Sequence, residues 1–221
     1  MSATTMSITA SDGHSLSCWH HPAPGQAMGG LVILQEIFGI TDQLKGVAAS
    51  YASQGFDVAM PALFDRVERH AVIPFDQAPK GREMMLSCDP DKVMADVAAA
   101  VDLLGGQQLP VAVLGFCWGG GLAVRAAQEL DIAAAVSFYG TRLQNYLNQP
   151  LRAPVQGHFG STDDHVPPEL LDQFRQAFPE TEIFMYDGGH AFANDARPSY
   201  VGAAAELAHQ RSLAFLKKQL S

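Results

Sequence analysis

Apolar residues along the chain follow two different spacings. Short runs of consecutive apolar, β-branched or aromatic residues predict buried strands, whereas apolar residues that recur every three or four positions predict helices. In the run Asp91–Leu104, for example, three valines and a leucine recur at helical spacing. The predicted strands are Gly30–Gln35, Phe56–Met60, Val111–Leu114, Ala133–Phe138, Ala153–Phe159 and Glu182–Tyr186. The predicted helices are Gln43–Gln54, Asp91–Leu104, Leu122–Leu130, Pro168–Ala177 and Ser199–Leu220.

Strands that alternate with helices are typical of a parallel sheet with helices on both faces. We therefore expect an α/β fold with a mostly parallel central sheet. Residues His14–Trp19 alternate more weakly and are expected to form an antiparallel strand near the N-terminal edge. No repeat, low-complexity tract or linker divides the sequence, so we expect a single domain over residues 1–221.

The segment Asp65–Ser87 breaks this alternation. Pro74, Pro79 and Gly81 interrupt any long periodicity, and the segment is therefore predicted to be irregular. In a parallel α/β fold, an excursion that follows a strand lies over the carboxyl ends of the sheet, where ligands bind. We expect this segment to form a wall of a binding pocket.

Composition and charge exclude several kinds of partner. The 221 residues carry a formal net charge of -9, which opposes nucleic acid or an anionic membrane as the main partner. No apolar stretch approaches the roughly 20 residues that span a bilayer, and the N-terminus lacks the pattern of a signal peptide. The cysteines, Cys18, Cys88 and Cys117, are too scattered for a disulfide framework. We expect a reduced, cytoplasmic protein whose oligomeric state stays open, with a monomer among the possibilities.

The most informative motif is Gly115–Gly120, which has Cys117 at its centre. It follows a strand-like run and leads into a helix-like run, and it has the G-x-nucleophile-x-G pattern of the α/β-hydrolase elbow, with cysteine in place of serine. So sharp a turn strains the backbone of its central residue and leaves no room for side chains two positions away, where Gly115 and Gly119 stand. The motif predicts an exposed thiol that attacks a carbonyl group.

A thiol nucleophile needs a base to accept its proton and an acid to orient that base. In this fold the acid and then the histidine follow the nucleophile along the chain. The sequence has Asp163 and Asp164 in the loop after one predicted strand, and His190 in a glycine-flanked loop after the next. We expect Cys117, Asp163 and His190 to act together, and Asp164 stays an alternative to Asp163. The remaining histidines lack metal-ligand spacing, so neither a metal nor another cofactor is expected.

Several motifs resemble the dienelactone hydrolase (carboxymethylenebutenolidase) family over about Ile8–Leu216. They are Gln35–Gly39, the elbow Gly115–Gly120, Gly160–Pro167, Gly189–Phe192 and the C-terminal Tyr200–Leu216. The resemblance implies an α/β-hydrolase fold in which Cys117 is the nucleophile, His190 the base and Asp163 its orienting acid. It also implies that Glu36 helps to deprotonate the thiol and that the backbone N–H groups of Ile37 and Trp118 form the oxyanion hole.

The same resemblance marks residues for substrate binding. Arg82 is the candidate for one of two arginines that hold a substrate carboxylate in the family, and Tyr139 matches an aromatic residue of the pocket. Ala191 and Asn194 stand where the family has a serine and the second arginine. Arg197 could replace that arginine only if its loop bends inward. The sequence therefore predicts the catalytic machinery of the family without its complete carboxylate clamp.

These observations predict a cysteine-dependent hydrolase that acts on small-molecule activated carboxylic esters or lactones through a thioester acyl-enzyme. A thiolate leaves a tetrahedral intermediate more readily than an ordinary alkoxide does, so forward collapse is favoured when the departing oxygen is an enolate or phenolate. The alternative is a non-catalytic relative that binds a small ligand or senses electrophiles through Cys117.

Overall fold

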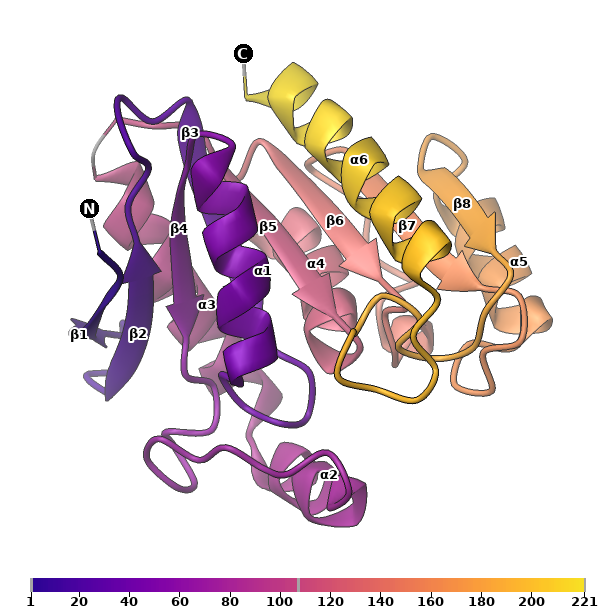
Figure 1. Cartoon of the computed structure of the whole chain (residues 1–221), viewed down its shortest axis with the longest axis horizontal. Helices are drawn as coiled ribbons and strands as arrows, with labels where there is room; N and C mark the ends of the chain where they lie inside the picture. Colours follow the sequence, from indigo (N-terminus) through magenta and orange to yellow (C-terminus); the bar gives the residue numbers. More distant parts are fainter. Residues whose placement is uncertain (1, 107, 221) are drawn as a thin grey trace. The chain divides into compact units, whose positions relative to one another are not determined.

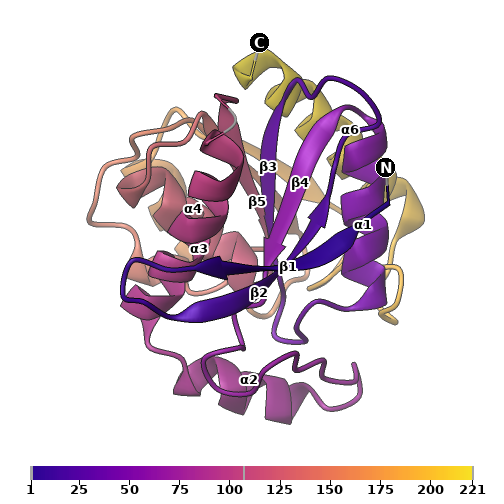
Figure 2. The same cartoon turned by 90° about the vertical axis from the view of Figure 1, so that its left-hand side faces the viewer.

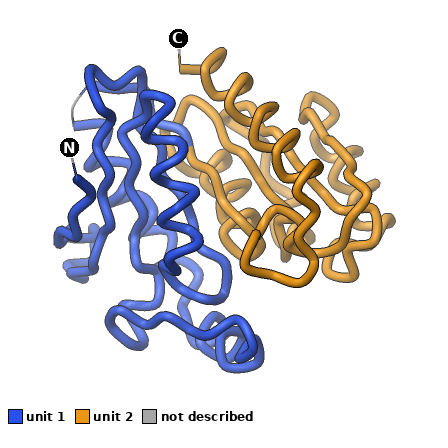
Figure 3. Tube along the Cα trace, viewed as in Figure 1, with its two compact units in different colours: residues 1–112 blue, residues 113–221 orange. Residues whose placement is uncertain are grey.

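The computed structural model describes residues 2–106 and 108–220. They group into two compact units, Met1–Ala112 and Val113–Ser221, which Figure 3 colours separately. Across the described residues, eight strands form a mostly parallel sheet in the order β1-β2-β4-β3-β5-β6-β7-β8, and helices alternate with them along the chain. The α/β fold that the sequence predicts is confirmed, whereas the single domain stays a prediction.

The strands of unit 1 are β1 (Thr4–Thr9), β2 (Ser15–His21), β3 (Gly29–Leu34) and β4 (Phe56–Pro61). β2 runs antiparallel to both β1 and β4, whereas β3 and β4 are parallel, with Leu31 opposite Val58. Every residue of β3 and β4 is buried, as in strands that are covered on both faces. In β1 only Ile8 is buried, which fits its place at the end of the strand order.

The helices of unit 1 are α1 (Asp42–Ser53), α2 (Ala78–Ser87) and α3 (Pro90–Gly105). α1 begins after Thr41, whose hydroxyl accepts the N–H of Leu44 at 3.2 Å, and α3 begins after Asp89, whose carboxylate accepts two N–H groups of the first turn. Figures 1 and 2 show α1 and α3 on opposite faces of the unit 1 strands and α2 away from both.

Unit 2 repeats the strand–helix alternation. Its strands are β5 (Val111–Phe116, which begins in unit 1), β6 (Ala134–Phe138), β7 (Val155–Gly160) and β8 (Glu182–Tyr186), and β6, β7 and β8 pair in parallel. Its helices are α4 (Trp118–Glu129), the short 3-10 helix η1 (Leu143–Asn145), α5 (Pro168–Ala177) and α6 (Gly202–Gln219). In Figure 1, α6 lies on one face of these strands and α4 on the other.

The structure differs from the sequence prediction most at α2, α4 and β1. The segment that the sequence predicts as irregular contains α2, because a proline in the first turn of a helix is tolerated and does not break it. α4 begins at Trp118 rather than Leu122, so its first turn includes a run of glycines that is a poor helix former. β1 was not predicted. In the described residues, no helix has the length and hydropathy that a membrane span requires.

Candidate active site

Cys117 lies in unit 2, at the sharp turn between the end of β5 and the start of α4. Its backbone has φ 54° and ψ -114°, in a region that side-chain-bearing residues rarely occupy. Main-chain hydrogen bonds hold it there: its N–H donates to the carbonyl of Phe138 at 3.0 Å, and its carbonyl accepts N–H groups of Gly120, Gly121 and Thr141 at 3.0–3.2 Å. The Cys117 side chain is half-buried, so the thiol is held at an elbow that leaves it accessible.

The glycines around Cys117 are required by close backbone packing. A Cβ on Gly115 would overlap the carbonyl oxygen of Gly119, and a Cβ on Gly120 would come within 2.8 Å of the carbonyl oxygen of Phe138. Neither neighbour is a flexible side chain that could move aside. The glycines therefore allow the strand, the elbow and the helix to pack as closely as the turn demands.

Asp163 and His190 lie in the loops after β7 and β8, and they are hydrogen-bonded to each other. Nδ1 of His190 lies 2.9 Å from Oδ2 of Asp163, and Oδ1 of Asp163 accepts the backbone N–H of His165 at 2.8 Å. The side chain of Asp163 is fully buried, whereas that of His190 is 18% exposed. Asp164 is exposed. Of the two adjacent aspartates, the one that the sequence favours is thus the one beside His190.

His190 is also hydrogen-bonded to the side chain of Cys117. Burial alone would lower the pKa of His190, but the hydrogen bonds and negative charges of Asp163 and Cys117 overcome burial and raise this pKa to about 10. At neutral pH the imidazole therefore holds its proton. A cationic imidazole beside a sulfur atom stabilises the thiolate, which is the nucleophilic form of cysteine.

Three further residues fix the position of His190. The rings of Tyr139 and His165 pack against the His190 ring, with centroids 5.2 and 4.3 Å away, and the hydroxyl of Ser199 donates to the His190 carbonyl at 2.7 Å. Tyr139 is fully buried, so the structure places this predicted substrate-binding residue against the ring of His190. The sequence predicts no site role for either of the other two residues, because His165 stands at an unspecified position of the Gly160–Pro167 motif and Ser199 belongs to no motif.

The predicted oxyanion donors lie in different units. Trp118 is the first residue of α4, where backbone N–H groups point outward from the helix end and favour negative charge. Ile37 and Glu36 lie in unit 1, in the loop that follows β3, and Glu36 is buried. Within this loop, the side-chain amide of Gln35 donates to the Glu36 carbonyl at 3.3 Å and accepts the N–H of Leu63 at 3.2 Å. The roles of Glu36 and Ile37 stay predictions.

The residues considered for substrate binding are spread over both units. Arg82 is exposed on α2 of unit 1. In unit 2, Ala191 is buried with φ 62°, and Asn194 is buried with its side-chain oxygen accepting the N–H of Ala196 at 3.0 Å. Asn194 therefore shapes its own turn. Arg197 is half-buried in the same loop.

A mostly parallel sheet and a sharp, strained turn at Cys117 between a strand and a helix define an α/β-hydrolase-type fold. Comparison with known families refines this class. The sequence pattern of the dienelactone hydrolase family matches residues 20–220. The chain therefore belongs to the dienelactone hydrolase family, a family of hydrolases.

Individual relatives agree with this membership. The chain is 33% identical to a protein of Escherichia coli O157:H7 described as "Putative carboxymethylenebutenolidase", over 90% of this chain and 81% of that protein. It is 30% identical to the carboxymethylenebutenolidase of Pseudomonas sp. (strain P51), over 96% of this chain and 94% of the relative. Among solved structures, the "Putative Dienelactone Hydrolase" of Klebsiella pneumoniae subsp. pneumoniae MGH 78578 superposes with a TM-score of 0.81 at 25% identity, covering 97% of this chain and 98% of its own.

Proposed function

We propose that the protein is a cysteine-dependent hydrolase of activated carboxylic esters or lactones that works through a thioester acyl-enzyme. The observation that carries this proposal is the arrangement in unit 2: a strained, accessible Cys117 hydrogen-bonded to His190, which is hydrogen-bonded in turn to the buried Asp163. This is the order of contacts that nucleophilic acyl transfer requires. Membership of a family with carboxymethylenebutenolidases supports the same substrate class.

In the first half-reaction, the thiolate of Cys117 attacks the ester carbonyl carbon and the carbonyl electron pair moves onto oxygen. The tetrahedral intermediate then collapses, the carbon–oxygen bond to the leaving group breaks, and a thioester remains on Cys117. His190 supplies the proton that the departing oxygen needs. Its high pKa suits this role, because the imidazole is protonated at neutral pH when the leaving group departs.

In the second half-reaction, His190 has lost that proton and can accept one from water. The resulting hydroxide equivalent attacks the thioester carbonyl, and a second tetrahedral intermediate expels the thiolate of Cys117. The products are the carboxylic acid and the restored pair of Cys117 and protonated His190. No covalent bond to Asp163 forms or breaks in either step. Its buried carboxylate keeps Nδ1 of His190 in place and stabilises the imidazolium form of that residue.

Both tetrahedral intermediates carry a negative oxygen, for which we propose the backbone N–H groups of Trp118 and Ile37 as donors. The place of Trp118 in the first turn of α4 supports its part, and the family resemblance supports that of Ile37. Removing one such donor typically costs about 2.7–4 kcal/mol of transition-state stabilisation. The resemblance also supports Glu36 as a group that assists deprotonation of the thiol. A reducing, cytoplasmic location suits a free catalytic thiol, and we include it in the proposal.

The decisive experiment compares the wild type with Cys117→Ala on p-nitrophenyl acetate and on dienelactone. We expect repeated turnover by the wild type and none by the variant, and we expect aryl and enol esters to be hydrolysed faster than alkyl esters. Retained turnover in Cys117→Ala would exclude this nucleophile. Stoichiometric labelling of the wild type without further turnover would instead support the non-catalytic, electrophile-sensing alternative. Cys88→Ala is the matched control, because Cys88 is a buried thiol whose pKa burial raises to about 11.

A further inference from the structure

Within unit 1, the segment 62–89 folds against the loop 35–39 that carries Glu36 and Ile37. The N–H of Ile73 donates to the carbonyl of Phe38 at 2.9 Å. The rings of Phe38 and Phe75 meet edge to face with centroids 4.8 Å apart. These contacts pair a loop that follows a buried strand with a segment whose larger part, Asp65–Ser87, the sequence predicts as irregular.

The closest contact is made by Gly81, which lies on α2. A Cβ added at Gly81 would overlap the carbonyl oxygen of Ile37, and it would lie 3.2 Å from the carbonyl carbon and 3.4 Å from the Cβ of the same residue. The atoms it would meet belong mainly to the Ile37 backbone, which cannot swing aside as the end of a side chain can. Glycine weakens a helix, so its place on α2 is best explained by this close approach.

A second glycine makes a similar contact at the other end of the loop. Gly39 has φ 80°, and a Cβ there would overlap the carbonyl oxygen of Ala71. Backbone therefore packs on backbone at two points, once on each side of Phe38. Such contacts transmit a displacement directly, because no flexible side chain lies between the two segments.

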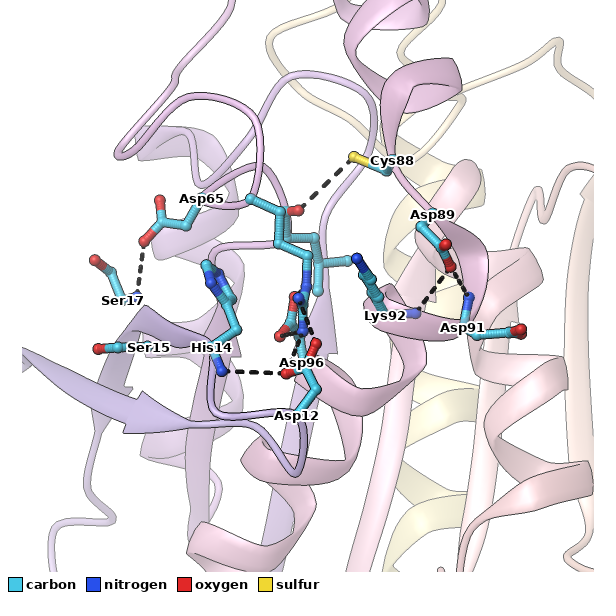
Figure 4. A network of polar contacts seen from close by, with 12 residues as sticks. Asp12, His14, Ser15, Ser17, Asp65, Cys88, Asp89, Asp91, Lys92 and Asp96 are labelled. Atoms are coloured by element: carbon cyan, nitrogen blue, oxygen red, sulfur yellow. Dashed lines mark hydrogen bonds and ion pairs between the residues drawn. The ribbon is translucent and has the colours of Figure 1, made fainter.

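The segment 62–89 is itself anchored to the rest of unit 1. The guanidinium of Arg66 donates to both oxygens of Asp96 at 2.7 and 2.8 Å, and to both oxygens of Asp12 at 2.8 and 3.1 Å. Asp65 accepts the N–H groups of Ser17 and His70 at 2.8 and 2.7 Å. Figure 4 shows Asp12 and Asp96 close together and the separate contact of Asp65 with Ser17. The side chain of Asp96 is fully buried and that of Arg66 nearly so, which makes the anchor a fixed support.

We propose that Gly81 is a positioning residue, through which α2 holds the Ile37 peptide in the orientation that an oxyanion donor needs. The N–H and C=O of Ile37 are joined through one Cα, so pushing the carbonyl away from α2 shifts or rotates the N–H as well. This inference rests on the proposed function, in which that N–H binds the oxyanion. A misplacement on the order of 1 Å in a group that acts on the reacting atoms can lower a rate about 10²-fold.

The test is Gly81→Ala, with Gly46→Ala as the matched control. Gly46 also lies in a helix, and a Cβ there would meet nothing within 4 Å. With p-nitrophenyl acetate, we expect Gly81→Ala to lower kcat about 10²-fold with little change in KM, because the N–H of Ile37 binds the oxyanion in the transition state and not the ground-state ester. Gly46→Ala should keep wild-type kinetics.

Two further readouts separate positioning from general damage. Alkylation of Cys117 by iodoacetamide forms no oxyanion, so its rate should stay within about twofold of wild type in Gly81→Ala. Binding of an aryl trifluoromethyl ketone, which forms a tetrahedral oxyanion adduct with the thiol, should weaken in parallel with kcat. An unchanged kcat in folded Gly81→Ala would overturn the proposal, and so would an equal fall in alkylation and turnover.

If Gly81→Ala does not fold, Phe75→Leu tests at a second contact whether the segment 62–89 positions the loop 35–39. It removes the ring contact with Phe38 without inserting an atom, so the loop 35–39 loses support from the same segment. We expect a smaller fall in kcat, on the order of 10-fold, with alkylation of Cys117 unchanged. Wild-type kcat in this variant would overturn the proposal. Failure of the proposed function is recognised separately, by turnover that survives in Cys117→Ala.

Discussion

Replacing Asp163 by asparagine should lower the pKa of His190 and slow catalysis. In the folded protein this pKa is about 10 against an ordinary 6.5, although burial alone would lower it. At about 1.4 kcal/mol per unit, the difference corresponds to roughly 5 kcal/mol in favour of the imidazolium, shared between Asp163 and Cys117.

An opposite charge at hydrogen-bonding distance typically contributes 1–3 pKa units, so we expect Asp163→Asn to lower the pKa of His190 by about 1–3 units. The corresponding change in a serine-protease triad lowers kcat about 10⁴-fold, and we expect a loss of about 10²–10⁴-fold here. Because the folded-state pKa is raised, the interaction also stabilises the fold below pH 6.5, and this contribution is lost as the pH rises through about 10.

The pKa of His190 can be followed by NMR titration of its ring protons in Cys117→Ala, with and without Asp163→Asn, so that the thiol makes no contribution. Turnover of p-nitrophenyl acetate is measured in the two corresponding proteins that retain Cys117. Asp164→Asn is the control, because Asp164 is the exposed neighbour and should change neither quantity. A His190 pKa that is the same with aspartate and asparagine at position 163 would refute the reasoning.

Three other outcomes follow from single contacts. Burial lowers the pKa of His158 to about 3, so on acidification the unfolded state binds this proton first and the stability of the fold decreases below pH 6.5. The free energy of unfolding, measured in urea, should therefore decrease by up to about 2.7 kcal/mol at pH 4.5. His158→Gln should remove this part of the pH dependence. Gly115→Ala should destabilise the fold by about 1–3 kcal/mol or more in thermal unfolding and abolish turnover, because the new Cβ overlaps the Gly119 carbonyl; wild-type activity would contradict the proposed elbow packing. His165→Ala should lower kcat several-fold more than His165→Phe, which keeps a ring against His190, and equal kinetics of the two variants would exclude a role for that ring contact.

The alternation of strands and helices was predictable because the buried strands are uninterrupted apolar runs. β3 and β4 are buried at every position, and this pattern needs no knowledge of tertiary contacts. β1 was not predicted because only one of its residues, Ile8, is buried, so its sequence lacks the apolar pattern of a buried strand. Its strand conformation comes with its pairing to β2. α2 escaped for a different reason: Gly81 reads as a helix breaker, whereas in the structure it meets the backbone of Ile37.

The candidate site was predictable to the extent that its residues belong to motifs. The elbow and the two loops could be read in order, but the sequence favoured Asp163 without excluding the adjacent Asp164. Their difference lies in burial and in the hydrogen bond to His190, which depend on how the two loops fold. His165 and Ser199 had no sequence signal, because ring packing and a hydroxyl contact to a main-chain carbonyl follow no fixed spacing.

The elbow at Cys117 has a consequence for how the chemistry of such a protein can diverge. Its conformation is held by main-chain hydrogen bonds, one donated to the carbonyl of Phe138 and three accepted from the N–H groups of Gly120, Gly121 and Thr141, and by glycines that admit no side chain. None of these supports involves the sulfur atom. The side chain at position 117 is therefore separable from the architecture that presents it, and a single codon change there can exchange thiol for hydroxyl without rebuilding the turn. Evolution can in this way explore new reactivity on an unchanged scaffold.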